Sequence, residues 1–265
     1  MTPIALCLLL AAAPSPVEEA AAALADFRPE DAVQLLEAAK EDGPFPHEEH
    51  ALLYEELGIA YAYLERSDDA VRAFVTMLAL DPTRAISYTL SPKVTFLFEE
   101  ARKQARGRPE PALDVSWPRD LKVEDPVPVD VGVLADPEGF LQRGRLYFRE
   151  KGQADFQSLT LQLPPPGRDL RQVKVPPLAA GATEPKVVEL YLVATDARDN
   201  EVLLFGSAAR PREVSLAYEP PDPWYGKWWV WVIAGSVVAA TAGTVAYAVT
   251  REPSPTVDGS FRWDR

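Results

Sequence analysis

The chain contains few of the residues that usually carry nucleophilic or metal-dependent chemistry. Its 265 residues include one cysteine and two histidines. Cys7 lies in an N-terminal apolar segment that we expect to be removed, so the mature chain would hold neither a disulfide nor a thiol nucleophile. His47 and His50 are spaced i, i+3, which is not the H-E-x-x-H zinc pattern, and we interpret them as part of a solvated helix start.

Basic residues and nucleotide-binding motifs are scarce as well. The chain carries 27 Lys and Arg against 40 Asp and Glu, a formal net charge of −13, whereas nucleic-acid binding needs a basic surface. It contains no P-loop and no G-x-G-x-x-G motif. Carboxylates are plentiful, but nothing singles out a glycosidase-type pair. We therefore predict a protein that is not an enzyme, uses no metal or cofactor, and does not bind nucleic acid.

An apolar run near the N-terminus predicts export. Ile4 to Ala13 is ten residues long, which is too short to span a bilayer but suits the core of a signal peptide. Ala11, Ala12 and Ala13 supply the small residues that a signal peptidase needs, although no Lys or Arg precedes the run. We predict a signal peptide over residues 1–16.

A second apolar run predicts a transmembrane helix over residues 228–249. Trp228 to Val249 has 22 residues without a charge, and as a helix it would cover roughly 33 Å. An aromatic juxtamembrane segment, residues 219–227, precedes it, and the arginines of the tail, residues 250–265, favour a cytoplasmic tail. The predicted location is the bacterial inner membrane, single-pass, with the domains in the periplasm. The alternative is a tail-anchored protein whose domains stay in the cytosol.

Small residues recur along one side of this predicted membrane helix. Gly235, Ala239 and Gly243 are spaced every four residues and form a continuous stripe. In lipid, helices associate where small residues let their backbones approach. The stripe favours a homodimer through the transmembrane helix, or docking of that face against another protein's helix.

Residues 17–106 have helical periodicity, and the segment from Ala51 to Arg84 carries a characteristic set of spaced residues. The set is Tyr54, Leu57, Gly58, Tyr61, Ala70, Phe74 and Pro82. With these residues and its length of 34 residues, the segment resembles a tetratricopeptide repeat. Gly58 is small where the two helices of such a hairpin would come closest, and Ser67 is the expected N-cap of the second helix. Less regular flanks predict about two and a half repeats.

The resemblance implies a protein-binding face on the first helix of the repeat. In that family, partners usually bind the concave face that the first helices line. The alternative is that these side chains only pack against neighbouring helices of a short stack. Carried onto this sequence, the binding face is Leu52, Glu55, Ile59, Ala62 and Tyr63.

After a polar hinge, residues 107–112, the pattern changes to short runs rich in β-formers. Runs at this spacing over residues 113–218 predict an antiparallel sandwich of immunoglobulin-like type. Residues 196–200 are interpreted as a hairpin turn. The fold class is therefore α followed by β, with one transmembrane helix. The expected strands are Leu113–Trp117, Val127–Leu134, Arg143–Arg149, Phe156–Leu163, Arg171–Val175, Val187–Ala194, Glu201–Phe205 and Glu213–Ala217.

These features together predict a membrane-anchored envelope scaffold or adaptor. Its partners would be other envelope proteins, bound through the helical repeats, the sandwich or both. The alternative is a single-pass signal relay, which the short tail disfavours because it contains no effector motif. A carboxylate-dependent hydrolase or glycan-binding module in the sandwich is the third and weakest alternative.

Overall fold

The chain consists of helices followed by two antiparallel sheets. The computed structural model describes residues 14–87, 89–167, 169–178, 181–220 and 226–233. The helices and sheets belong to one compact unit that ends at Tyr218, and a second unit begins at Glu219. The predicted order of helices before antiparallel strands is confirmed.

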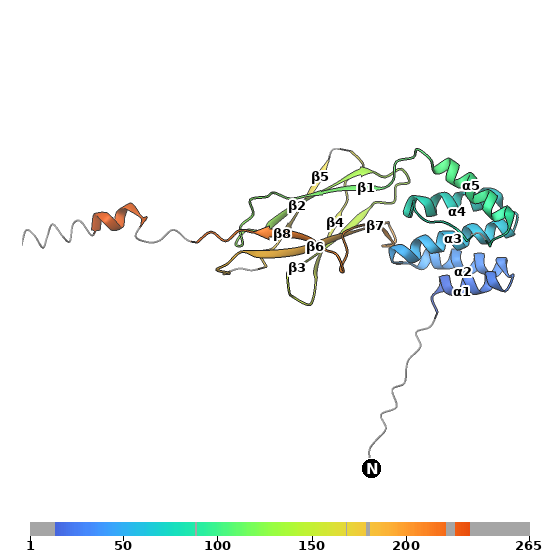
Figure 1. The fold of residues 1–265 in the computed structure, drawn as a ribbon, viewed down its shortest axis with the longest axis horizontal. Helices are drawn as coiled ribbons and strands as arrows, with labels where there is room; N and C mark the ends of the chain where they lie inside the picture. Colours follow the sequence, from blue (N-terminus) through green and yellow to red (C-terminus); the bar gives the residue numbers. More distant parts are fainter. Residues whose placement is uncertain (1–13, 88, 168, 179–180, 221–225, 234–265) are drawn as a thin grey trace, which may run out of the picture. The chain divides into compact units, whose positions relative to one another are not determined.

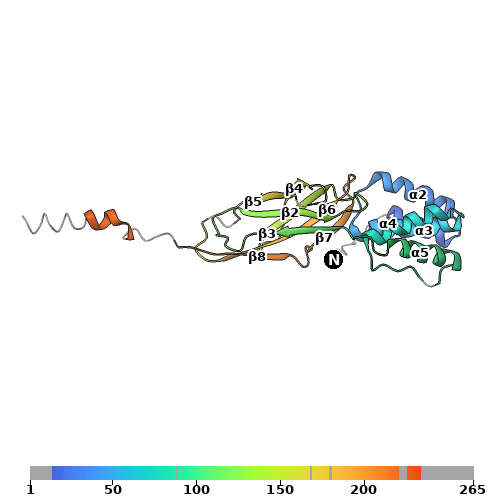
Figure 2. The same ribbon diagram turned by 90° about the horizontal axis from the view of Figure 1, so that it is seen from above.

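Among the described residues, five helices make up the N-terminal part of this unit, and each packs on its neighbour in sequence. They lie beyond one end of the strands (Figures 1 and 2). Short turns join the first four, whereas a longer connection over residues 81–91 leads to the fifth. The helices are α1 (Pro16–Ala25), α2 (Pro29–Asp42), α3 (His47–Tyr63), α4 (Ser67–Leu80) and α5 (Pro92–Ala105).

Local chemistry fixes several helix ends. Ser15 and Glu18 form a reciprocal capping box at the start of α1, and Ser91 caps α5 by accepting from the Val94 amide. The prediction that Ser67 caps α4 is wrong, because Ser67 is the first helical residue. Glu65 adopts a left-handed conformation, and the next amide bonds back to the Tyr61 carbonyl. After this turn at Glu65, only Arg66 precedes the first residue of α4.

The close approach predicted at Gly58 is present between α3 and α4. A Cβ at this position would lie 2.5 Å from Cε1 of Phe74, whose side chain is fully buried. The Phe74 ring meets the Phe98 ring of α5 edge-on, with centroids 5.6 Å apart. The helical core is therefore built around one ring that needs a glycine opposite it.

The helices do not repeat with a constant period. The first helices of successive hairpins begin at residues 16, 47 and 92, which are steps of 31 and 45 residues. A tetratricopeptide array would keep a step of about 34 residues. The prediction of tetratricopeptide-like repeats is therefore wrong: the 34-residue segment around Gly58 is one helical hairpin, and its residue pattern reflects the packing of that hairpin.

In the part of the chain that the structure describes, eight strands follow in two antiparallel sheets that enclose an apolar core. The smaller sheet has the order β1-β2-β5, and the larger has the order β4-β3-β6-β7 with β8 also on β6. The predicted strands are confirmed to within about one residue at each end, and residues 196–200 form the β6–β7 hairpin turn. The strands are β1 (Ala112–Ser116), β2 (Val127–Ala135), β3 (Arg143–Glu150), β4 (Gln157–Gln162), β5 (Leu170–Val175), β6 (Lys186–Thr195), β7 (Glu201–Phe205) and β8 (Arg212–Leu216).

The predicted membrane anchor is not supported. Among the residues that the structure describes, no helix has the length and apolarity that crossing a membrane requires. Residues 228–233 are helical, and residue 233 is the last residue that the structure describes. The remainder of the predicted span, with Gly235, Ala239 and Gly243, lies outside the described residues, as do residues 1–13. The predictions of a transmembrane helix and of a single-pass inner-membrane location are therefore wrong for the described chain, because an uncharged sequence alone does not establish a spanning helix.

Candidate docking site at the junction of helices and sandwich

A short loop between α2 and α3 is bonded to the turn between β6 and β7. The Phe45 amide donates to Oδ1 of Asn200 over 2.9 Å, and the Glu201 amide donates to the Phe45 carbonyl, also over 2.9 Å. Asn200 is only 3% exposed, and its Nδ2 donates to the Asp196 carboxylate over 2.9 Å. The residues predicted as a simple hairpin turn therefore also join the helices to the sandwich.

The start of α3 completes this contact. His50 is 4% exposed, and its Nδ1 lies 3.1 Å from the Glu201 carbonyl oxygen. Burial lowers the pKa of His50, so the ring is neutral at pH 7 and Nδ1–H donates to that carbonyl. The His47 amide donates to the Glu201 carboxylate over 3.1 Å. The interpretation of His50 as part of a solvated helix start is wrong, because the β7 strand covers it.

Apolar side chains extend the contact between the two parts. A small core cluster joins Ala51 of α3 and Leu80 of α4 to residues of β2, β6 and β7. Arg108 and Glu138 add an ion pair of 3.0 Å, and Arg198 and Glu41 another of 2.6 Å. The helices and the sandwich are thus held together by buried hydrogen bonds, apolar contacts and peripheral charges.

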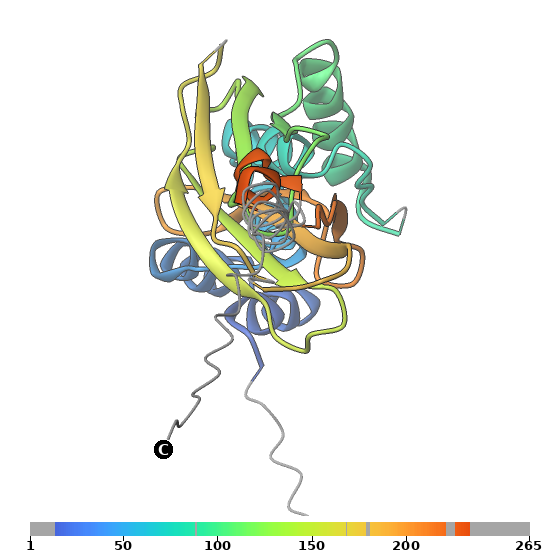
Figure 3. The same ribbon diagram turned by 90° about the vertical axis from the view of Figure 1, so that its left-hand side faces the viewer.

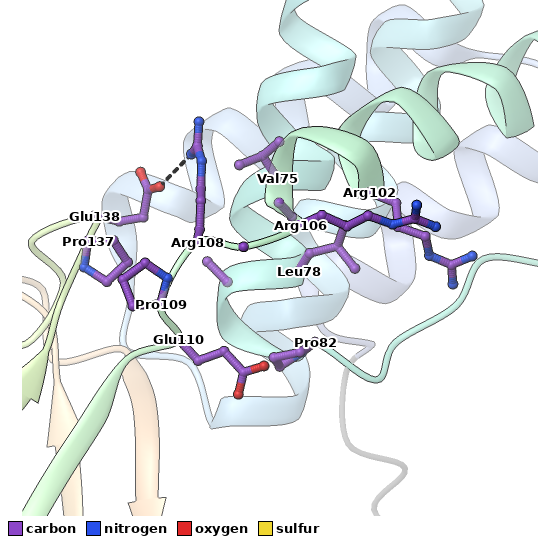
Figure 4. A pocket seen from close by; sticks show the side chains of 13 residues that line it. Val75, Leu78, Pro82, Arg102, Arg106, Arg108, Pro109, Glu110, Pro137 and Glu138 are labelled. Carbon is purple, nitrogen blue, oxygen red and sulfur yellow. Dashed lines mark hydrogen bonds and ion pairs between the residues drawn. The ribbon is translucent and has the colours of Figure 1, made fainter.

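A pocket of about 280 Å³ opens beside this junction (Figure 4). It lies among α4, the end of α5, the residues after α5, and the loop between β2 and β3. Its apolar lining comprises Val75, Leu78, Ala79, Pro82, Ala105, Pro109 and Pro137. Most of the predicted hinge, residues 107–112, therefore forms one wall of a pocket.

The charged side chains around the pocket are not all neutralised within the molecule. Arg108 is paired with Glu138, and Arg102 is paired with Glu99 over 3.0 Å. Arg106 is exposed and forms no ion pair with any described residue. In Figure 4 the Arg102 and Arg106 side chains extend to the same side of the pocket. The lining thus holds three arginines and two glutamates, and Arg106 leaves one guanidinium beside the apolar floor that no described residue neutralises.

The face predicted to bind partners lies on α3, and none of its five residues lines this pocket. Ile59 and Ala62 are buried, at 6% and 0% exposed, and Leu52 is partly buried. The Glu55 carboxylate is paired with Arg84 over 2.5 Å, and only Tyr63, 40% exposed, is open to solvent. The packing alternative accounts for most of these contacts, and the binding role of this face stays a prediction.

Glu56 is a half-buried carboxyl on the same helix. Burial, and then the neighbouring Glu55, raise the pKa of Glu56 to about 7, although Arg84 opposes the shift. No described residue donates a hydrogen bond to this carboxylate. Nothing in the sequence distinguishes Glu56 from an ordinary surface glutamate.

The residues that carried the repeat resemblance are mainly core residues. Leu57, Tyr61, Ala70 and Phe74 are buried, and Tyr54 is partly buried against the same core. The Tyr61 hydroxyl donates to the Glu37 carboxylate of α2. Pro82, two residues past the end of α4, lines the pocket.

Comparisons with known proteins give no family. No protein-family model matches the chain, and no curated protein matches it. Among solved structures, it is similar to the CARDB domain of the PF1109 protein from Pyrococcus furiosus, which was crystallised in complex with di-metal ions. That similarity has 10% identity and a TM-score of 0.26, over 43% of this chain and 90% of that one. Such a weak likeness supports no conclusion about function, and membership of the tetratricopeptide family is not supported.

The described residues contain no cluster of three or more His, Cys, Asp or Glu side chains that could hold a metal ion. The sequence could have pointed to the cations of the pocket, since Arg102, Arg106 and Arg108 follow one another at the end of a predicted helix. It could not have shown the pocket itself, because the loop that carries Glu138 approaches only in the folded chain.

Proposed function

We propose that this protein is a non-enzymatic adaptor that holds a short segment of a partner polypeptide in the junction pocket. One observation carries the proposal: an apolar floor lies beside Arg106 and Arg102 in a chain whose net charge is −13. The occupant is an apolar side chain of the partner with a carboxylate close to it. The carboxylate accepts charge-assisted hydrogen bonds from a guanidinium while the apolar side chain occupies the floor.

The size of the pocket supports a peptide side chain as the occupant. About 280 Å³ is near the lower limit of the roughly 300–1,000 Å³ that pockets for drug-sized ligands and cofactors occupy. One large side chain with part of its backbone fits such a volume.

The lining supports binding in preference to catalysis. Among the described residues that form the pocket there is no serine, cysteine, histidine or tyrosine. Its carboxylates belong to Glu110 and Glu138, and the second is occupied by Arg108. The junction also holds the walls in place before a partner arrives, which reduces the entropy cost of binding.

The test is selection from a random peptide library displayed with free C-termini, followed by fluorescence anisotropy of the selected peptides with the full chain. We expect the selected peptides to share an apolar side chain within a few residues of a carboxylate. Arg106→Ala should weaken their binding by about 10- to 100-fold, since a hydrogen bond to a charged group contributes about 1.5–3 kcal/mol. Ala79→Trp should fill the floor and weaken binding of the same peptides.

Lys103→Ala is the matched control, because Lys103 is an exposed cation on the same last turn of α5 that does not line the pocket. It should bind the peptides as the wild type does. Equal binding by wild type, Arg106→Ala and Ala79→Trp would reject the pocket as the docking site. So would a selection that enriches no common peptide.

A further inference from the structure

Strand β4 leaves one edge of the larger sheet open. Among the described residues, β4 forms strand pairing with β3 alone. Strand β5, an edge strand of the other sheet, lies at the same edge of the sandwich (Figure 3) and does not pair with β4. Its sequence is QSLTLQ, and Ser158, Thr160 and Gln162 are exposed. An open strand edge carries unpaired amides and carbonyls that can pair with another strand.

The other described edge strands are protected by charge, and β4 is not. Charged side chains on an edge strand discourage pairing with a second molecule. The protecting residues are Asp114 in β1, Arg171 and Lys174 in β5, Glu201 in β7, and Arg212 and Glu213 in β8. Strand β4 has no charged residue and no proline.

The backbone direction shows which groups are free. The Leu163 amide donates to the Gln142 carbonyl just before β3, so the polar groups of Leu163 point towards that strand. Because successive residues of a strand direct these groups to opposite sides, those of Ser158, Thr160 and Gln162 point to the open edge.

The free edge is self-complementary about Thr160. If two copies align antiparallel with Thr160 opposite Thr160, then Ser158 lies opposite Gln162 and Leu159 opposite Leu161. The two leucines face the interior of the sandwich, where Leu161 is buried and Leu159 is partly exposed. The Thr160–Thr160 pair and the two Ser158–Gln162 pairs each form two hydrogen bonds between an outward amide and an outward carbonyl. The edge therefore gives about six main-chain hydrogen bonds.

We infer that this protein associates with a second copy of itself through β4, with Thr160 on the two-fold axis. The two five-stranded sheets then become one continuous sheet across the dimer. The area of a six-residue edge is at the low end for specific interfaces, below about 1,200 Å² in total, so the dimer is weak and depends on concentration. No residue of β4 lines the junction pocket, so this inference is independent of the proposed function.

The test is sedimentation velocity of the full chain across micromolar to sub-millimolar concentrations. We expect a monomer–dimer equilibrium that strengthens as salt is added, because each copy carries a net charge of −13 and salt screens their repulsion. Thr160→Lys and Thr160→Glu each place two like charges on the axis and should weaken dimerisation at least tenfold. An equimolar mixture of the two variants should recover it.

Ser116→Lys is the matched control, because it adds the same charge to an exposed position on the edge strand β1. It should dimerise as the wild type does. A chain that is monomeric throughout the range overturns the inference. A dimer that Thr160→Lys does not weaken, or a mixture that does not recover association, places the contact elsewhere and overturns it equally.

Discussion

Replacing Gly58 by alanine tests the packing of the helical core. The alanine Cβ would lie 2.5 Å, 2.6 Å and 2.8 Å from three carbons of the Phe74 ring, distances that real Cβ atoms do not show. Phe74 cannot move aside freely, because it is fully buried and its ring meets Phe98 edge-on. The substitution must therefore displace the ring, the helix or both.

Two effects oppose one another at this position. Alanine in a helix interior is more favourable than glycine by about 1 kcal/mol. Overpacking a dense core typically costs about 1–3 kcal/mol, and the contact with Phe74 leaves no space to reduce that cost. We expect the overpacking cost to lie in the upper part of this range, at about 2–3 kcal/mol. After the helix-propensity gain of about 1 kcal/mol, the free energy of unfolding should fall by about 1–2 kcal/mol.

Urea denaturation of the full chain, followed by circular dichroism in the helical band, measures this difference. The matched experiment is the same substitution in a Phe74→Leu background, where the ring is absent. Gly58→Ala should then be neutral or stabilising, because only the helix-propensity term remains. If Gly58→Ala is as stable as the wild type when Phe74 is present, the close approach is not as tight as the structure has it and the reasoning fails.

Three further changes test individual side chains. Glu56→Gln should stabilise the protein above pH 7 by at most about 3 kcal/mol. Because the pKa of Glu56 is raised to about 7, the protonated carboxyl contributes its full stability below the unfolded pKa of 4.5, and this contribution is lost as pH rises through 7. Urea midpoints measured over a pH series test this, and the same pH profile for wild type and variant would contradict it. His50 has a lowered pKa, so stability is complete above about pH 6.5 and declines as pH falls towards the folded value. His50→Gln should remove that part of the decline, and thermal melts between pH 5 and pH 8 would measure it. Asn200→Ala should cost about 1–3 kcal/mol in urea denaturation, because the buried Phe45 amide loses its acceptor; a loss near zero would mean that water replaces it.

The strands could be predicted from the sequence because each has a local cause. Alternation of apolar and polar residues in β3 and β6, with turn residues between runs, gave ends close to those observed. Gly58 could be predicted for a similar reason, since a small residue amid large ones in a helical pattern indicates close contact.

The junction could not be predicted, because its partners are distant in sequence. Phe45 and Asn200 are 155 residues apart, and nothing near either indicates the other. The sequence around His50, with Pro44 and Pro46 before it, indicates an exposed loop and helix start, yet His50 and Phe45 both contact β7. The prediction of tetratricopeptide repeats failed for a different reason. One helical hairpin matches the residue pattern of a single repeat, but the neighbouring helices do not follow at the constant step that the family requires.

Hydrogen exchange at the amides of Phe45 and Glu201 measures whether the helices and the sandwich are joined at this point. The docking pocket beside the junction exists because they are joined. Both amides donate hydrogen bonds across the junction over 2.9 Å, and the bond from Phe45 is buried. They should therefore exchange as slowly as amides in the β3–β6 ladder, and Asn200→Ala should accelerate the exchange at Phe45. Exchange at both amides as fast as in an exposed turn, in the wild-type full chain, would contradict the account.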